Sequence, residues 1–278
     1  MDDYFLTFIY PNLNQLIMFI DAHSHLSSYG ENIPSVIAMA RSVGVKHIIA
    51  VGSTYNSSEG ALKCSREYPD FVHPAVGISY RFAKRDEPLE KLLGDVKKID
   101  ALVKNEKRII AIGEIGIDTG ITLQRRYGDQ VRIFREQLEI AQKYRKGVIV
   151  HSFSDPNLIN TEREALKILA EYDVKPVVMH FFQAREEEDV KAAVDAGYYF
   201  SVAPQDVYGN LNDKSEAVVS QIDPSKLIIE TDGPRGENIW PDVLPLVAKT
   251  VAKIKKKDAE EMEKILYDNA QKIYFDNL

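Results

Sequence analysis

Residues 131–151 read VRIFREQLEIAQKYRKGVIVH, and they contain both of the elements from which the fold is built. From Val131 to Ala141, apolar residues recur at helical spacing, which predicts an amphipathic helix with one apolar face. Gly147 ends this helix, and the continuous apolar run 147–150 follows it directly. Because the run does not alternate with polar residues, it is typical of a parallel strand that is buried on both faces. The stretch therefore predicts one unit of a parallel sheet that is covered by helices.

The same pattern of a short apolar run and a longer helical segment recurs along the whole chain. The predicted strands are residues 19–22, 46–51, 71–76, 109–113, 147–150, 176–179, 198–202 and 227–230. Since no Ser/Gly/Pro-rich linker separates the units, we predict one α/β domain, a (β/α)8 TIM barrel over residues 18–278, rather than two smaller domains. Residues 1–17 precede a second methionine, Met18. We interpret them as a start codon placed too early, with an ordered N-terminal extension as the alternative.

Composition excludes several classes of protein. The chain has 278 residues, of which 45% are hydrophobic, which suffices for a large core and excludes intrinsic disorder. Its 35 Lys+Arg and 42 Asp+Glu give a net charge of −7, which argues against an extended basic face for nucleic acid. The single cysteine, Cys64, indicates a reducing compartment. We expect a cytoplasmic protein without a membrane span or signal peptide, and no residue pattern indicates its oligomeric state.

Side chains that bind metals follow five of the eight predicted strands, at the barrel end where catalytic residues lie. They are His23 and His25 after the first strand, Glu114 after the fourth, His151 after the fifth, His180 after the sixth and Asp232 after the eighth. A histidine at the end of one buried strand is more often a packed residue than a ligand. The HxH pair differs, because residues i and i+2 of a strand point to the same side. Together, the six residues predict a metal centre.

Six ligands exceed the needs of one catalytic ion, so we expect two divalent ions, with Glu114 as the bridge between them. His23, His25 and Asp232 would hold one ion, and His151 and His180 the other. A hydroxide between the ions would act as nucleophile, and Asp232 would take or shuttle its proton. The donor set suits Zn, Mn, Fe or Co, and Mg less well. These roles make Glu114 and Asp232 the expected catalytic residues of a metal-dependent hydrolase.

Three further reactive side chains are expected to be structural. His47 and His73 lie at or near the start of their predicted strands, away from the ligand-bearing end. Cys64 falls in a predicted helix with no histidine close to it in the sequence, which indicates a small buried residue rather than a nucleophile.

At these residues the chain resembles the TatD family of metal-dependent deoxyribonucleases, within the amidohydrolase-like barrels. The segments 19–26 (FIDAHSHL) and 113–118 (GEIGID) resemble its first two motifs, and the resemblance extends over residues 18–278. Further similar positions are Gln130, Phe134, Gln137, Ala141, His151-Ser152, His180-Phe181, Glu230-Thr231-Asp232, Asn269-Ala270 and Tyr274-Phe275. The resemblance implies metal ligands at His23, His25, Glu114, His151, His180 and Asp232, in agreement with the reading of the strand ends.

The chain departs from the family pattern where substrate would be bound. Ser79-Tyr80 stands where the family has His-Pro after the third strand, and Phe153 replaces an arginine after the fifth. Phosphate contacts would then fall to the metals and to Arg81 and Arg235. Our first hypothesis is a hydrolase that cleaves DNA phosphodiesters in single strands or from an end. The alternatives are a hydrolase of a small phosphoester, lactone or amide, and a metal-binding scaffold without turnover.

Overall fold

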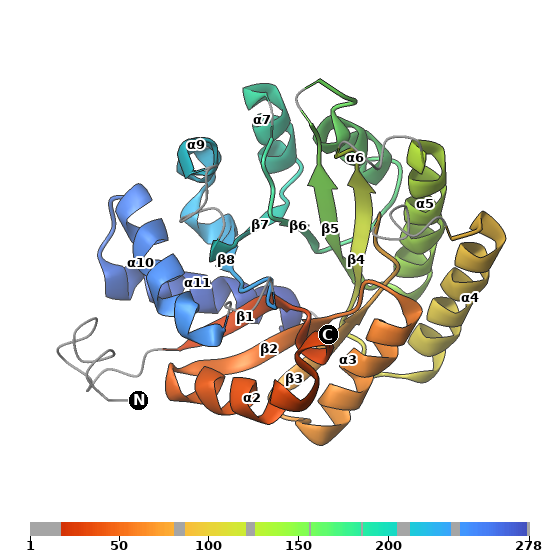
Figure 1. The fold of residues 1–278 in the computed structure, drawn as a ribbon. Coiled ribbons are helices and arrows are strands. Elements are labelled where there is room, and N and C mark those ends of the chain that lie inside the picture. The colour runs from red at the N-terminus through yellow and green to blue at the C-terminus, as the bar shows by residue number, and fades with distance from the viewer. Residues whose placement is uncertain are drawn as a thin grey trace.

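The computed structural model of the chain describes residues 18–80, 87–120, 126–155, 157–184, 186–204, 212–234 and 240–276. Parallel strands form one eight-stranded sheet, in which each strand pairs with the next one in the sequence (Figure 1). They are β1 (Phe19–Ser24), β2 (Val45–Val51), β3 (Val72–Val76), β4 (Ala111–Asp118), β5 (Gly147–Phe153), β6 (Val177–His180), β7 (Tyr199–Val202) and β8 (Leu227–Ile229). Residues 1–17, the possible misplaced start or extension, lie outside the described residues.

Hydrogen bonds between β1 and the segment after β8 close the sheet into a barrel. The backbone N–H of Asp232 donates to the carbonyl of His23 over 2.9 Å, and the N–H of His25 donates to the carbonyl of Gly233 over 2.7 Å. Closure removes the two exposed edges that an open sheet would present. The predicted (β/α)8 barrel is confirmed.

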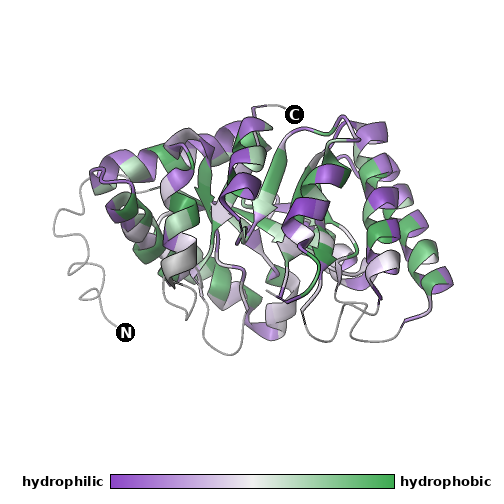
Figure 2. Ribbon diagram, turned by 90° about the horizontal axis from the view of Figure 1, so that it is seen from above, coloured by the Kyte–Doolittle hydropathy of each residue, from purple (hydrophilic) through white to green (hydrophobic). Residues whose placement is uncertain are grey.

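Helices alternate with the strands and cover the outside of the barrel (Figure 1). They are α2 (Ile33–Ser42), α3 (Tyr55–Glu67), α4 (Leu89–Asn105), α5 (Tyr127–Tyr144), α6 (Thr161–Leu169), α7 (Glu187–Asp195), α9 (Asn212–Gln221), α10 (Leu244–Ile254) and α11 (Ala259–Tyr274), with the 3-10 helices η1 (Leu26–Asn32), η4 (Pro224–Lys226) and η5 (Pro241–Val243). Hydrophobic residues concentrate in the strands, whereas the outer helix surfaces are largely hydrophilic (Figure 2). In the described part of the chain, no helix is both long enough and apolar enough to cross a bilayer.

The strands are buried on both faces, as their continuous apolar runs predict. In β2, Ile48 and Ala50 belong to the large cluster that packs under the helices, whereas Ile49 and Val51 belong to a second cluster. This second cluster holds alternate residues of the other strands and the end of α11, so it fills the inside of the barrel. The strand faces that point inward therefore determine which polar side chains can meet at the end of the barrel.

Two strands continue further than their apolar runs indicate. The run 109–113 predicts a strand that stops before Glu114, but β4 extends to Asp118 and is buried throughout. In the same way, β5 extends past His151 to Phe153, with which Asp118 pairs. The polar ends of both strands keep their pairing because they are buried in the barrel rather than exposed to solvent. Glu114 and His151 consequently lie within strands, on rigid backbone.

Candidate metal centre

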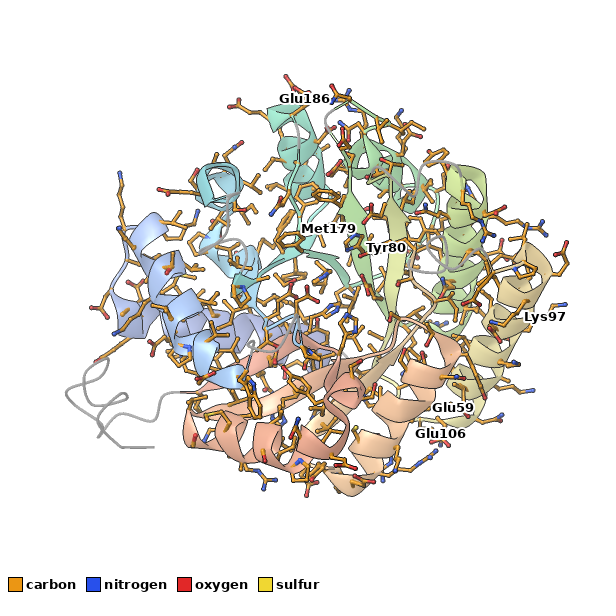
Figure 3. All side chains as sticks on the ribbon, viewed as in Figure 1. Glu59, Tyr80, Lys97, Glu106, Met179 and Glu186 are labelled. Carbon is orange, nitrogen blue, oxygen red and sulfur yellow. The ribbon has the colours of Figure 1, made fainter. Side chains whose placement is uncertain are left out.

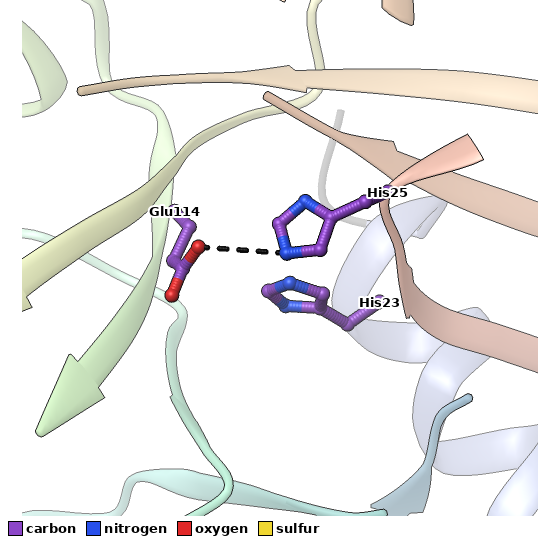
Figure 4. Close-up of side chains that lie close together, drawn as sticks. All are labelled: His23, His25 and Glu114. Atoms are coloured by element: carbon purple, nitrogen blue, oxygen red, sulfur yellow. Dashed lines mark ion pairs between the residues drawn. The ribbon is translucent and has the colours of Figure 1, made fainter. Parts of the chain in front are cut away.

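The two histidines at the end of β1 lie beside Glu114 of β4, inside the barrel (Figure 4). Nε2 of His25 is 3.6 Å from Oε2 of Glu114, and the ring centroids of His23 and His25 are 5.0 Å apart. One ligand atom from each of the three residues lies within 4.8 Å of the others. A single cation placed among these atoms could contact all three side chains.

The other oxygen of Glu114 faces a second pair of histidines. Oε1 lies 3.3 Å from Nδ1 of His151. Glu114, His151 and His180 again offer three ligand atoms within 4.8 Å of one another. Glu114 therefore belongs to both groups and directs a different oxygen toward each, which is the arrangement of a carboxylate that bridges two cations.

Asp232 lies between the histidines of the two groups. Its Oδ1 is 3.6 Å from Nε2 of His25, and 3.9 Å from Nε2 of both His23 and His180. The backbone of Asp232 has a φ of 50°, in the left-handed region that residues other than glycine seldom adopt. A backbone outlier at this point holds the carboxylate over the end of the barrel, where loops after the strands carry function.

Shifts in strand pairing bring the ligands of β1 and β4 to the inner face. Ala111 belongs to the inner cluster, and regular alternation would put Glu114, three residues later, on the opposite face. The pairing of β4 with β5 shifts between Ile112 and Ile115, and such an irregularity redirects the side chains that follow it. β1 has a comparable shift within its last four residues. By contrast, β5 and β6 need none, since His151 and His180 each come two positions after an inner apolar residue, and Asp232 comes four positions after Ile228 of β8.

Two buried carboxylates orient the histidines of the second group. Nε2 of His151 lies 3.2 Å from Oδ2 of Asp118, and Nδ1 of His180 lies 2.6 Å from Oε1 of Glu230. Each contact leaves the opposite ring nitrogen directed at the centre. The strand-end pattern does not include these carboxylates, although the sequence carries a signal for them. Asp118 lies four residues after Glu114, and Glu230 two residues before Asp232, an even spacing that places side chains on the same side of a strand.

The charge of Glu230 also changes the basicity of His180. Burial alone would lower the pKa of His180, but the charge of Glu230 and its hydrogen bond outweigh burial and raise that pKa to about 9. A more basic imidazole is a stronger ligand for a cation. The carboxylate therefore both orients the ring and strengthens it as a donor.

Asp21 fixes the loop that carries Asp232. Its carboxylate accepts hydrogen bonds from the backbone N–H of Thr231 over 2.9 Å and from the Thr231 hydroxyl over 2.8 Å. Burial raises the pKa of Asp21 to about 7, and the bonds from Thr231 oppose that shift. The two hydrogen bonds from Thr231 to Asp21 therefore join β1 to the segment after β8, next to the candidate ligands.

The donor set fits a metal cation. Nδ1 of His151 is buried and makes no hydrogen bond within the described residues, although it faces a carboxylate oxygen of Glu114. Buried polar atoms are almost always satisfied, and a cation between these two atoms would satisfy the histidine nitrogen. Imidazole and carboxylate donors are the ligands that Zn, Mn, Fe and Co accept. His23, Glu114 and Asp232 are at most 4% exposed, so the ions would lie in an environment of low dielectric.

The remaining predicted residues lie elsewhere. Arg81 and Arg235, predicted to contact phosphate, fall outside the described residues. His47 and His73 meet inside the barrel, where Nε2 of His73 is 3.1 Å from Nδ1 of His47 and both rings contact Phe275. Cys64 is buried in α3, and burial raises the pKa of its thiol to about 11, which makes it a poor nucleophile.

Comparison with known proteins identifies the family. The family described as TatD related DNase matches residues 20–275. The chain belongs to this family. The expectations of a TatD-type barrel and of a metal-dependent hydrolase are confirmed.

Relatives and solved structures of the TatD family match nearly the whole chain. The uncharacterized metal-dependent hydrolase YabD of Bacillus subtilis is 27% identical, over 92% of this chain and 99% of its own length. The 3'-5' ssDNA/RNA exonuclease TatD of Edwardsiella piscicida is 23% identical, over 88% of this chain and 94% of its own. The crystal structure of YjjV, a TatD homolog from Escherichia coli, has a TM-score of 0.79 at 20% identity and covers 95% of this chain and 100% of that one. The last comparison shows a shared fold.

Proposed function

We propose that this TatD-family protein hydrolyses phosphodiester bonds of DNA, in single strands or from an end, with two divalent ions held at the end of the barrel. The observation that carries the proposal is the position of Glu114, whose two oxygens face two separate groups of histidines. A strand end that is bound at the proposed metal centre requires no extended basic stripe. The net charge of −7 is therefore compatible with a nuclease.

Each ligand has a position in the proposed centre. His23, His25 and Asp232 would hold one ion, His151 and His180 the other, and Glu114 both. When bound, the ions supply Lewis acidity for the phosphate and activation of water. Oδ1 of Asp232 lies among the Nε2 atoms of three histidines, where it can accept a proton from an attacking water. Asp118 and Glu230 hold the imidazoles of the second group in place, and Thr231 with Asp21 holds the backbone of Asp232.

A second candidate function is hydrolysis of a small phosphoester, lactone or amide at the same centre. Among the described residues, an aromatic side chain lies against His151, since the ring of Tyr80 stacks on the imidazole, and Phe153 stands at the end of the same strand, β5. A phosphodiester needs donors or cations around its non-bridging oxygens, whereas a neutral ester needs fewer. This aromatic side of the centre favours a less charged substrate.

One experiment separates these functions. Protein freed of metal and reloaded with Mg²⁺, Mn²⁺, Zn²⁺ or Co²⁺ is assayed for bound metal, then tested on end-labelled single-stranded DNA and on small phosphoesters, lactones and amides. Wild type runs beside Glu114→Gln and beside His47→Gln, a control that removes a histidine far from the centre. We expect DNA cleavage that falls more than about 10²-fold in Glu114→Gln, since loss of residues that only support a ligand already costs 10–100-fold. The control should keep its activity.

The other outcomes are equally informative. Turnover of small esters alone would favour the second candidate, and two bound metals with no turnover would indicate a scaffold. Wild-type protein that binds no divalent ion would overturn the assignment of the centre.

A further inference from the structure

The ring of Tyr80 lies flat against the imidazole of His151. Their centroids are 4.2 Å apart and their planes differ by 24°, which is a stacked arrangement. Tyr80 follows β3 and is 8% exposed, and His151 beneath it is 6% exposed. Tyr80 lies near the middle of the barrel opening, close to β4 and β5 (Figure 3). The aromatic ring therefore covers one face of a candidate metal ligand.

Three contacts together fix the orientation of the His151 ring. Asp118 holds the Nε2 edge at 3.2 Å, and Tyr80 covers one face. The Nδ1 edge is then directed at Oε1 of Glu114, 3.3 Å away. Rotation of the His151 side chain about its Cα–Cβ bond would break the stack and the contact with Asp118 at the same time.

The backbone on both sides of this contact is held by one helix. Gln137 of α5 accepts a hydrogen bond from the Ile78 N–H over 2.7 Å and donates to the Ile78 carbonyl over 3.0 Å. One face of the same helix carries Gln130, which binds the N–H and carbonyl of Asp118 over 2.8 and 2.9 Å. The segment leading to Tyr80 and the residue that holds His151 are thus tied to the same rigid element.

Close backbone packing between β4 and β5 adds to this rigidity. Gly116 has a φ of 134°, and a Cβ atom there would lie 2.0 Å from the carbonyl oxygen of His151. Only glycine allows this approach. Asp118 and His151, on adjacent strands, are therefore held at a fixed separation.

We propose that Tyr80 is a positioning residue that strengthens cation binding by the group of Glu114, His151 and His180, and this inference rests on the metal centre of the proposed function. An imidazole that binds a cation loses electron density, and the electron-rich face of a phenol ring stabilises such a ring by stacking. The stack also limits His151 to one rotamer before the cation arrives, so less freedom is lost on binding.

The test compares metal binding of wild type, Tyr80→Phe and Tyr80→Leu by calorimetric titration with Co²⁺ and by the visible spectrum of the bound Co²⁺. Phe71→Leu is the matched control, because Phe71 precedes the same strand at its opposite end and is 6% exposed. We expect Tyr80→Leu to weaken one of two binding steps about three- to tenfold, the range that aromatic pairs provide, with a change in the spectrum. Tyr80→Phe should keep both steps, and Phe71→Leu should change neither.

Unchanged Co²⁺ binding in Tyr80→Leu would overturn the proposal, as would equal weakening in Phe71→Leu. A measurement without metal separates this inference from the proposed function. In imidazole ¹⁵N spectra, wild type and Tyr80→Phe should show His151 in one tautomer with the proton on Nε2, toward Asp118, and Tyr80→Leu should show exchange between tautomers. If wild type binds no metal but shows this difference, the proposed function fails together with the effect on cation binding, and only the orientation of His151 by Tyr80 stands. If wild type binds two metals and the tautomer is the same in all variants, the positioning role fails alone.

Discussion

Nδ1 of His180 and Oε1 of Glu230 lie 2.6 Å apart in the interior, where neither residue is more than 2% exposed. The hydrogen bond joins the ends of two strands that flank β7, since β6 pairs with β7 and β7 pairs with β8. It directs Nε2 of His180 toward Asp232. The relationship links the end of β8 to His180 on β6 and places Glu230 beside the proposed metal centre, where it also belongs to a group of possible ligand atoms with His23 and His180.

Glu230→Gln should weaken metal binding and activity. The amide retains a hydrogen-bonding group but removes the charge that makes His180 basic, so we expect about 10–100-fold weaker binding of one ion. Calorimetric titration with Zn²⁺ or Co²⁺ measures it. Asp189→Asn is the control, because it neutralises another buried carboxylate, one that binds Arg163 between α6 and α7. The control should lower Tm and leave metal affinity unchanged; equal affinity in Glu230→Gln and wild type would contradict the assigned role.

Much of the candidate centre could be predicted from strand ends, because three of its residues come an even number of positions after an inner apolar residue. His151 and His180 each follow an inner apolar residue by two positions, and Asp232 follows Ile228 by four. Glu114 does not, since its inward direction depends on a shift in strand pairing that no local pattern reveals. Glu114 could be named as a candidate ligand from its residue type, but the geometry that turns it inward could not be predicted.

Contacts between distant segments could not be predicted. The stack of Tyr80 on His151 joins a loop to a strand 71 positions later, and the pair His47–His73 depends on the register of β2 with β3. Each of these residues has several plausible environments when the sequence is considered alone. The environment that each residue adopts depends on packing against neighbours that are distant in the sequence.

Removal of metal should lower stability. The centre brings the carboxylates of Glu114 and Asp232 together at 1% and 4% exposure, so cations that neutralise them favour the folded state. At a free ion concentration of about 1,000 Kd, binding contributes about 4 kcal/mol, which corresponds to a rise in Tm of roughly 8–15 °C for a chain of this size. Scanning calorimetry with chelator and with Zn²⁺ or Mn²⁺ measures the rise. His23→Ala should reduce it, and the same Tm with and without metal would refute the expectation.

Stability should fall in mild acid because of His73. Burial and the neighbouring His47 lower the pKa of His73 to about 4, while Asp70 opposes the shift, and the unfolded chain has the ordinary value of 6.5. Between these values the unfolded state binds more protons, so the free energy of unfolding decreases as the pH falls from 6.5 toward 4. In chelator, His73→Gln should lose less stability than wild type between pH 7 and 4.5, as measured by urea midpoints. Parallel losses in the two proteins would show that His73 does not contribute.

Gln137→Leu should destabilise the barrel and disturb the Tyr80 segment. The amide satisfies both the N–H and the carbonyl of Ile78 in a buried position, and leucine, which has nearly the same size, satisfies neither. Two buried backbone groups left without partners cost roughly 2–4 kcal/mol. Urea unfolding measures this cost. Gln142→Leu is the matched control, since Gln142 lies on the same helix, α5, but accepts its hydrogen bond at an exposed position, from the N–H of Asp173. The control should change the free energy of unfolding by less than about 1 kcal/mol. Because Ile78 lies two residues before Tyr80, Gln137→Leu should also weaken Co²⁺ binding. A loss of stability with unchanged Co²⁺ affinity would show that Tyr80 keeps its position without the hydrogen bonds between Gln137 and Ile78.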